Sequence, residues 1–499
     1  MQNIILHKPS LLKTVNVNRK IFIIFVILLS FISEVFGQQT SAAASAEQRA
    51  RAYIEALNSN KRTEWRKFIG ENYTKTALER IPMEGRLGSF SRIYDETRGL
   101  SIQGVSQTRP NEVSVSVKSN LTGQFFDLIV QVEEQSPFQL NSMGLRTQPL
   151  KDKKLSEKEI VEELDNHLKK LATADIFSGA VLLARGNNVL YEKAFGEANK
   201  DFKALNNVNT KFNLGSMNKM FTSVAIAQLV EAGKLSFDDS LSKFMPDFPD
   251  KVSAQKIKIK HLLSHTSGLG NYFNQAFIDG SRARFRTVDD FLELAKDEKM
   301  MFEPGTRWQY SNTGMLILGK VIEKVSGQNY FDYIRENIYQ KAGMLNSDSY
   351  DLDNVNPNLA IGYEKTYAEQ GITFSNNIFI HVIRGGPAGG GYSTVGDLLK
   401  FAKALQDGKL ISKDLFKTMT IAKTELSSPN YGYGFFVNAN PSSTGHSGGF
   451  VGISSELIIF TNSDYIAVVL SNYGSGSQTV TGKIRGLIQV CAECQTVKN

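Results

Sequence analysis

A serine and a lysine stand three positions apart in the stretch NLGSMNKMFTS. Ser216 and Lys219 fall in an apolar run whose spacing predicts a helix, which would bring them onto one face, one turn apart. A serine hydroxyl becomes a good nucleophile when an adjacent base takes its proton, and lysine is such a base when burial lowers its pKa. Because a serine at a helix start is more often a cap, the pair alone does not establish a catalytic site.

A second pair follows in PGTRWQYSNTGMLILGK, where a tyrosine precedes an asparagine by two positions. The hydroxyl of Tyr310 can pass a proton between a serine and a leaving group, and the amide of Asn312 can bind a substrate carbonyl. The alternative is a core tyrosine followed by an asparagine that caps the next predicted helix.

A third element, TGHSGGFVGISSELIIFTNSDYIAVVLSN, combines a glycine-rich run with two strand-like runs. The glycines beside His446 leave one strand edge bare, so the backbone of a substrate could lie against it. The alternative for a lone histidine in a glycine-rich strand is a structural role.

The order Ser216-x-x-Lys219, Tyr310-x-Asn312 and His446-x-Gly448 resembles the three-motif pattern of the penicillin-recognising serine hydrolases. The chain resembles the β-lactamase-related family, which includes class C β-lactamases, D-alanyl-D-alanine carboxypeptidases, D-aminopeptidases and certain esterases. The stretches HLLSHTSGLG, LVEAGKLSFDDSLSKFMPDFP and GGPAGGGYSTVGDLLKFAKAL extend the likeness over roughly residues 175–485.

The resemblance implies an acyl-enzyme mechanism with Ser216 as the nucleophile, Lys219 as its base and Tyr310 as a second proton carrier. It places the oxyanion hole at the backbone N–H groups of Ser216 and Gly449, where two fixed donors are typically worth a few kcal/mol. No metal or organic cofactor is implied. The substrate-binding residues that it implies are Asn312, His446, Ser447, Gly448 and Gly449.

His446 stands where β-lactamases of this type usually carry lysine, and a neutral histidine binds a carboxylate less strongly. This departure favours a peptidase acting on D-amino-acid peptides or an esterase acting on small carboxylic esters. A β-lactamase proper and a catalytically weak protein that binds peptidoglycan or peptides are the alternatives. The expected partner is a small molecule or peptide, with cell-wall peptides and β-lactams among the candidates.

Several elements must position these residues. A hairpin is predicted in FSGAVLLARGNNVLYEKAFG, a long helical region follows, and a second hairpin lies near the C-terminus. Together they predict an antiparallel sheet covered by helices. The resemblance implies an α/β (α+β) fold of the β-lactamase/transpeptidase type with an all-α lobe, over residues 173–499.

The preceding region, residues 38–150, has a helical pattern and then three alternating, strand-like runs, which is typical of a compact α+β unit. In pattern and length it resembles the cone-shaped domains of the nuclear-transport-factor-two-like superfamily. A spacer or dimerisation module without chemistry is the simpler interpretation. Residues 151–172 form a charged linker that continues as an amphipathic helix.

The first 37 residues carry basic residues, then IFIIFVILLSFI, then the small residues Val35 and Gly37 at the spacing of a cleavage site. The apolar run is shorter than the roughly 20 residues of a membrane span. We expect a cleaved signal peptide (1–37) and export to the periplasm or medium, without a stable membrane span. An uncleaved signal anchor is the alternative.

The formal net charge of the 499 residues is +7, and omitting the four bases and one acid of the first 37 residues leaves +4. So small a charge, without a basic tract, argues against nucleic-acid binding. The only cysteines, Cys491 and Cys494, favour a local disulfide in an oxidising compartment.

Three further features in the hydrolase region attract attention. We interpret His265 as structural, Thr394 as the start of a capping box with Asp397, and the glycines of 385–391 as either a pocket wall or a flexible loop.

Overall fold

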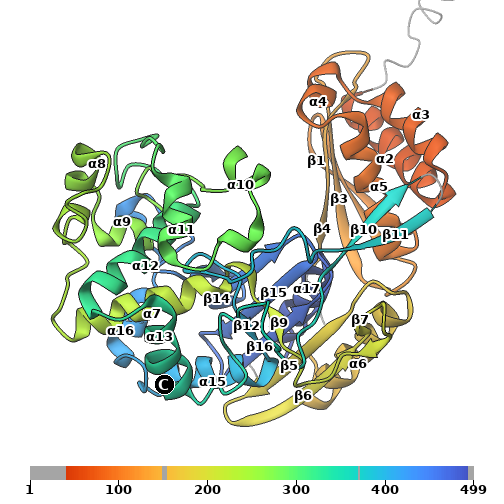
Figure 1. Ribbon diagram of the computed structural model, residues 1–499. Coiled ribbons are helices and arrows are strands. Elements are labelled where there is room, and N and C mark those ends of the chain that lie inside the picture. The colour runs from red at the N-terminus through yellow and green to blue at the C-terminus, as the bar shows by residue number, and fades with distance from the viewer. Residues whose placement is uncertain (1–40, 149–153, 369–370, 493–499) are drawn as a thin grey trace, which may run out of the picture.

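The central feature of the computed structural model, which describes residues 41–148, 154–368 and 371–492, is a six-stranded sheet (Figure 1). All of its neighbouring strands are antiparallel, in the order β13-β14-β15-β16-β5-β6. The predicted signal peptide and Cys494 lie outside the described residues. The strands are β5 Gly179–Arg185, β6 Asn188–Phe195, β13 Phe436–Ala439, β14 Ser442–Phe450, β15 Ile453–Phe460 and β16 Tyr465–Ser471.

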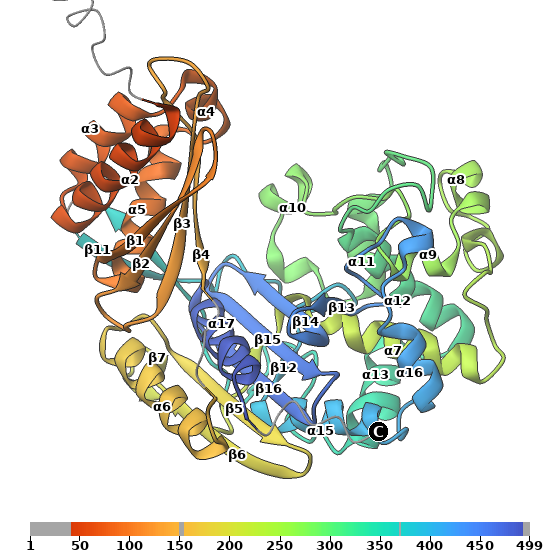
Figure 2. The same ribbon diagram turned by 180° about the vertical axis from the view of Figure 1, so that it is seen from behind.

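Both faces of this sheet are buried, because its central strands are apolar at nearly every position. Along β16, Ile466 and Val468 join the larger core, whereas Ala467 and Val469 join a second core on the opposite face. Two helices, α6 (Glu157–Thr173) and α17 (Gly476–Gln489), cover that second face, as Figure 2 shows for α17.

Helices that include the segments around Ser216 and Asn312 cover the other face and form a helical lobe beside it (Figure 1). The central helix α7 is buried from Asn218 to Ala227 and packs against α12. The helices of this part are α7 Asn218–Glu231, α8 Lys251–Lys256, α9 Ile259–Leu263, α10 Gln275–Asp279, α11 Val288–Leu292, α12 Asn312–Ser326, α13 Tyr330–Ile334, α14 Gln340–Ala342, α15 Val395–Gln406 and α16 Lys413–Met419.

Short strand pairs connect these layers. One pair, β9 with β12, joins the segment before Ser216 to the segment after the glycine-rich loop. Another is the hairpin of β10 and β11, which projects away from the sheet (Figure 1). The short strands are β7 Glu197–Asn199, β8 Ala204–Leu205, β9 Phe212–Asn213, β10 Tyr363–Ala368, β11 Gly371–Asn376 and β12 Tyr392–Ser393.

The N-terminal part of the described chain has its own four-stranded antiparallel sheet, in the order β1-β2-β3-β4, with helices packed on one face (Figures 1 and 2). An aromatic cluster that includes Tyr53, Trp65, Phe68 and Phe90 fills the space between them. Its elements are α2 Ala42–Ser59, α3 Arg62–Asn72, α4 Lys75–Arg80, α5 Met83–Thr97, β1 Leu100–Arg109, β2 Glu112–Ser119, β3 Phe125–Val132 and β4 Leu140–Thr147.

The predicted α+β class, with an antiparallel sheet flanked by helices, is confirmed. One local prediction is wrong: Ser216 does not open a regular helix. It lies in a 3₁₀ turn, Gly215–Met217, and α7 begins at Asn218. None of the helices in the described ranges is long and apolar enough to cross a bilayer.

Candidate active site

Ser216 lies in the tight turn that leads into α7. Gly215 has a φ of +50°, which an L side chain rarely adopts, so glycine allows the turn to form. The first residues of α7 receive no hydrogen bond from a capping side chain. The serine is therefore no helix cap, and its hydroxyl is free to contact Lys219.

Lys219 is completely buried one turn along from the serine. Its Nζ lies 3.0 Å from Ser216 Oγ, 2.8 Å from Asn312 Oδ1 and 2.5 Å from the Ala388 carbonyl oxygen. Among the described residues, no carboxylate pairs with it. Burial therefore holds the pKa of Lys219 well below its ordinary value. A neutral amine can donate two N–H groups to the amide and carbonyl oxygens and direct its lone pair at the serine hydroxyl.

Tyr310 completes the contacts around the serine. Lys219 Nζ lies 4.8 Å from the centre of its ring. Burial raises the pKa of Tyr310 above its ordinary value, although a hydrogen bond with Ser216 acts in the opposite direction. The phenol is therefore protonated at neutral pH and can donate or relay a proton.

Asn312 is the first residue of α12, but it does not cap that helix. The hydroxyl of Ser311 accepts from the Gly314 N–H at 2.8 Å, which is the capping contact. The amide of Asn312 is thus available to bind Lys219 through Oδ1 and to donate to Asn271 Oδ1 at 3.1 Å. The capping alternative for Asn312 is wrong.

The turn at Ser216 packs directly against strand β14. A Cβ added to Gly215 would lie 2.9 Å from the Gly449 backbone nitrogen, and one added to Gly448 would collide with the Leu214 carbonyl oxygen. Only glycines let the two backbones approach this closely. Gly449, whose N–H is the second predicted oxyanion-hole donor, therefore lies beside the turn that carries the serine.

His446 is buried on the same strand, and its ring centre lies 6.4 Å from that of Tyr310. Its Nε2 lies 2.8 Å from the hydroxyl of Tyr431 and its Nδ1 lies 2.5 Å from the Ser447 carbonyl oxygen. Burial, with Lys219 nearby, lowers the pKa of His446 to about 3. The imidazole is neutral and its nitrogens are engaged, whereas Ser447 is exposed.

An apolar pocket of about 60 Å³ opens beside the serine. Of the predicted residues, Ser216, Asn312 and Gly449 line it, together with Gly389 and Gly390 of the glycine-rich loop, whereas Lys219, Tyr310, His446, Ser447 and Gly448 do not. Its remaining walls are mostly aromatic or aliphatic. They are formed by Tyr272, Phe273, Phe277, Phe291, Val382, Phe450 and Ile453, among others.

Two residues that line the pocket, Asn213 and His381, were not predicted from the sequence; Asn213 contacts the turn at Ser216, and His381 contacts Asn213. Asn213 Oδ1 accepts from the Gly215 N–H at 2.8 Å, and its Nδ2 lies 2.6 Å from Nε2 of the buried His381. His381 Nδ1 lies 2.7 Å from the Val382 carbonyl oxygen. In the sequence, the only indication of this role was that Asn213 lies three residues before the serine; nothing marked His381.

The two remaining candidates are structural. His265 has a φ of +60°, accepts from the Ser311 N–H at 3.2 Å and packs its ring 4.4 Å from the centre of Tyr310. Thr394 caps α15 by accepting from the Asp397 N–H at 3.2 Å, but Asp397 accepts from Asn346 instead of reaching back. Within the described part of the chain, no His, Cys, Asp and Glu cluster could hold a metal ion.

The fold and the arrangement of the site are those of a serine hydrolase, and comparison with known proteins agrees. The Beta-lactamase family model matches residues 164–490. A penicillin-binding protein of Bacillus subtilis is 32% identical over 315 residues, which cover 59% of this chain and 68% of the relative. The chain spans about two thirds of the length of the curated relatives it matches.

Solved structures give the same result. The penicillin-binding protein of Bacillus halodurans superposes with a TM-score of 0.58 at 30% identity, covering 66% of this chain and 99% of that one. A D-stereospecific amidohydrolase from a Streptomyces species shares the fold, with a TM-score of 0.52 at 24% identity over 65% and 96% of the two chains. The chain belongs to the beta-lactamase family and is a serine hydrolase.

The buried neutral His446 predicts acid sensitivity. Since its pKa is about 3 in the folded protein and 6.5 ordinarily, the unfolded chain binds more protons between these values. The free energy of unfolding should therefore fall as the pH drops through this window, by up to about 1.4 kcal/mol per pH unit from this residue. Urea unfolding across the window measures the slope. His446→Gln, which keeps a polar partner for Tyr431, should flatten it, and equal slopes would contradict a neutral buried imidazole.

Proposed function

We propose that the chain hydrolyses amides or esters through an acyl-enzyme on Ser216. The proposal is supported above all by one observation: a completely buried lysine, which pairs with no carboxylate in the described ranges, lies 3.0 Å from the serine hydroxyl. A general base works best when its pKa is near the working pH, and burial lowers that of Lys219 in this direction. For a lysine with a purely structural role, burial without an opposite charge would only disfavour the protonated amine and the folded state.

The proposed reaction has two halves. Lys219 takes the proton of Ser216 as the serine oxygen bonds to the substrate carbonyl carbon, and the N–H groups of Ser216 and Gly449 stabilise the developing oxyanion. Tyr310 then relays the proton to the departing amine or alcohol, whose bond to carbon breaks. In the second half, water gives its proton to the same pair, attacks the acyl ester and releases the acid with a regenerated serine.

We propose a substrate with an apolar group on the acyl side. Aromatic side chains, including Phe273 and Phe450, line the pocket next to the serine, and they favour a bulky apolar substituent. Asn312 also lines it and would bind the substrate amide or carbonyl. His446 is neutral and engaged by Tyr431, so it offers no positive charge to a substrate carboxylate.

These features favour D-amino-acid amides or peptides and small carboxylic esters over β-lactam antibiotics, whose carboxylate would lack a cationic partner at His446. Relatives and neighbours named as penicillin-binding proteins, together with a neighbour named as a D-stereospecific amidohydrolase, fit this choice. The residue pattern of positions 1–37 supports export, which would bring the enzyme to cell-wall peptides.

A paired substrate panel tests this proposal. We expect kcat/KM for D-phenylalanine amide and p-nitrophenyl esters of apolar acids to exceed that for nitrocefin by at least about tenfold, one well-filled apolar contact being worth that much. Phe450→Ala should lower kcat/KM for the aromatic substrate about tenfold and leave that for an acetyl ester nearly unchanged. Faster hydrolysis of nitrocefin than of all other substrates would overturn the preference and favour a β-lactamase.

A further inference from the structure

The β10–β11 hairpin connects two distant parts of the molecule. Its strands pair from Tyr363 with Asn376 to Ala368 with Gly371. In both ribbon views it leaves the central sheet and ends beside the N-terminal helices (Figures 1 and 2). Such a projecting hairpin is usually marginal alone and needs a partner at its outer end.

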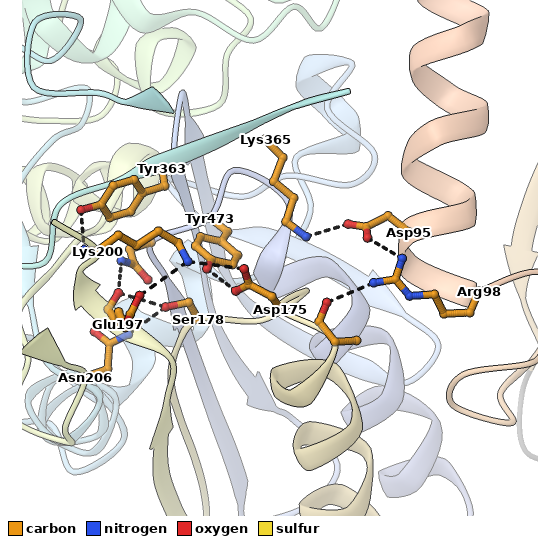
Figure 3. Close-up of polar contacts among 12 residues, drawn as sticks. Asp95, Arg98, Asp175, Ser178, Glu197, Lys200, Asn206, Tyr363, Lys365 and Tyr473 are labelled. Atoms are coloured by element: carbon orange, nitrogen blue, oxygen red, sulfur yellow. Dashed lines mark hydrogen bonds and ion pairs between the residues drawn. The ribbon is translucent and has the colours of Figure 1, made fainter. Parts of the chain in front are cut away.

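The outer end is attached by an almost fully buried ion pair. Lys365 Nζ lies 2.6 Å from Asp95 Oδ2 of α5, and only 11% and 3% of these side chains are exposed. Arg98 lies 2.9 Å from the other oxygen of this carboxylate (Figure 3). The hydroxyl of Tyr367 donates to Asp95 Oδ2 at 3.2 Å. A buried charge pair with further hydrogen bonds specifies one geometry, because any displacement leaves a charge unpaired.

The base of the hairpin is fixed to the sheet at a second place. The N–H of Tyr363 donates to the Asn472 carbonyl at 2.8 Å, and its hydroxyl accepts from the Lys200 N–H at 2.8 Å. Lys200 also lies 3.4 Å from Asp175, which accepts from the hydroxyl of Tyr473 at 2.5 Å (Figure 3). The hairpin therefore cannot pivot freely at its base.

Next to this base, two side chains at the start and end of the hairpin bind the turn between β14 and β15. One binds a backbone N–H of the turn and the other binds a backbone carbonyl. Glu364 Oε2 accepts from the Gly452 N–H at 2.9 Å, and Asn377 Nδ2 donates to the Val451 carbonyl at 2.8 Å. A Cβ on Gly452 would lie 2.6 Å from the Gly362 carbonyl carbon, so the two backbones touch. Glu364 and Lys365 are consecutive, and one contacts this turn while the other contacts the N-terminal helices.

The turn held in this way adjoins the reacting centre. Gly449, Phe450 and Ile453, on either side of Val451 and Gly452, line the pocket beside Ser216. We propose that Glu364 and Asn377 are positioning residues for the oxyanion strand, and that the N-terminal helices contribute to catalysis through Asp95 and Lys365 by holding the hairpin. This inference rests on the proposed acyl-enzyme function and adds a role for a part of the chain that contains none of the catalytic motifs.

The test compares variants of the full-length protein by their rate of labelling with a fluorophosphonate. Phosphonylation of Ser216 needs the oxyanion donors, and a displacement of about 1 Å can cost about 100-fold. We expect Glu364→Ala to label about 10- to 100-fold more slowly than wild type. Glu364→Gln keeps an acceptor oxygen for Gly452 and should label at nearly the wild-type rate. For an ester substrate, kcat should fall in Glu364→Ala while KM changes little.

Lys365→Met and Asn377→Ala extend the test to both ends of the hairpin, and each should slow labelling in the same direction. Asp239→Asn, which removes a carboxylate that pairs with Lys243 in the helical lobe, is the control and should label at the wild-type rate. Should Glu364→Ala unfold at the assay temperature, the other two variants decide the outcome. Unchanged labelling in all folded variants would overturn this inference alone, whereas a wild type that never labels would overturn the proposed function.

Discussion

Replacing Lys219 with Met is expected to slow acylation of Ser216 by about 10³- to 10⁴-fold while leaving the fold intact. The amine lies 3.0 Å from the hydroxyl and is the group positioned to take its proton. Methionine has a similar length and adapts to the buried space, but it has no basic nitrogen. Stopped-flow acylation with an activated ester, with thermal unfolding measured in parallel, checks both halves of the prediction.

The stability half follows from the direction of the pKa shift. Burial lowers the pKa of Lys219 in the folded state below its ordinary 10.5, so at lower pH the unfolded chain binds more protons and this lysine disfavours folding. In the Met variant this destabilising effect of the buried amine is absent, and so are the hydrogen bonds to Asn312 and Ala388. These effects oppose each other, and Tm at neutral pH should change little.

A matched control is Lys243→Met, on an exposed lysine of the helical lobe, which should alter neither rate nor Tm. Acylation at the wild-type rate in Lys219→Met would show that another group is the base. Loss of folding in Lys219→Met would instead assign the lysine a structural role.

The sequence predicted the larger elements because their signals are local. The hairpin around 186–187 and the one before Tyr465 were both visible as apolar runs separated by turn residues, and both form. The three motifs are separated from one another by more than 90 residues, so only the family resemblance predicted that they form one site. No local sequence pattern predicts the contact between Asn312 and Lys219. Their proximity is a property of the packed α7 and α12.

What escaped prediction depends on contacts between distant segments. The aromatic pocket wall comes from several separate elements, and no periodicity marks Phe273 or Phe450 as neighbours. The sequence predicted that His446 binds substrate, but it gave no sign of the contact between its Nε2 and the hydroxyl of Tyr431. The ion pair of Lys365 with Asp95 joins residues 270 positions apart and leaves no trace in either local sequence.

The central claim is that Ser216 is the residue that becomes covalently acylated. Its hydroxyl is not engaged as a helix cap, and it faces both the buried amine and the pocket. Ser216→Ala removes a single oxygen from a site that tolerates alanine sterically, so the variant should fold like the wild type. Loss of the nucleophile in serine hydrolases costs up to about 10⁶-fold in kcat, which leaves no measurable turnover.

Intact-protein mass spectrometry after incubation with a fluorophosphonate tests that claim most directly. We predict that wild-type protein gains the mass of one phosphonyl group, that peptide mapping assigns it to Ser216, and that Ser216→Ala gains none under the same conditions. Equal labelling of wild type and Ser216→Ala, or labelling mapped to another residue, would contradict the account.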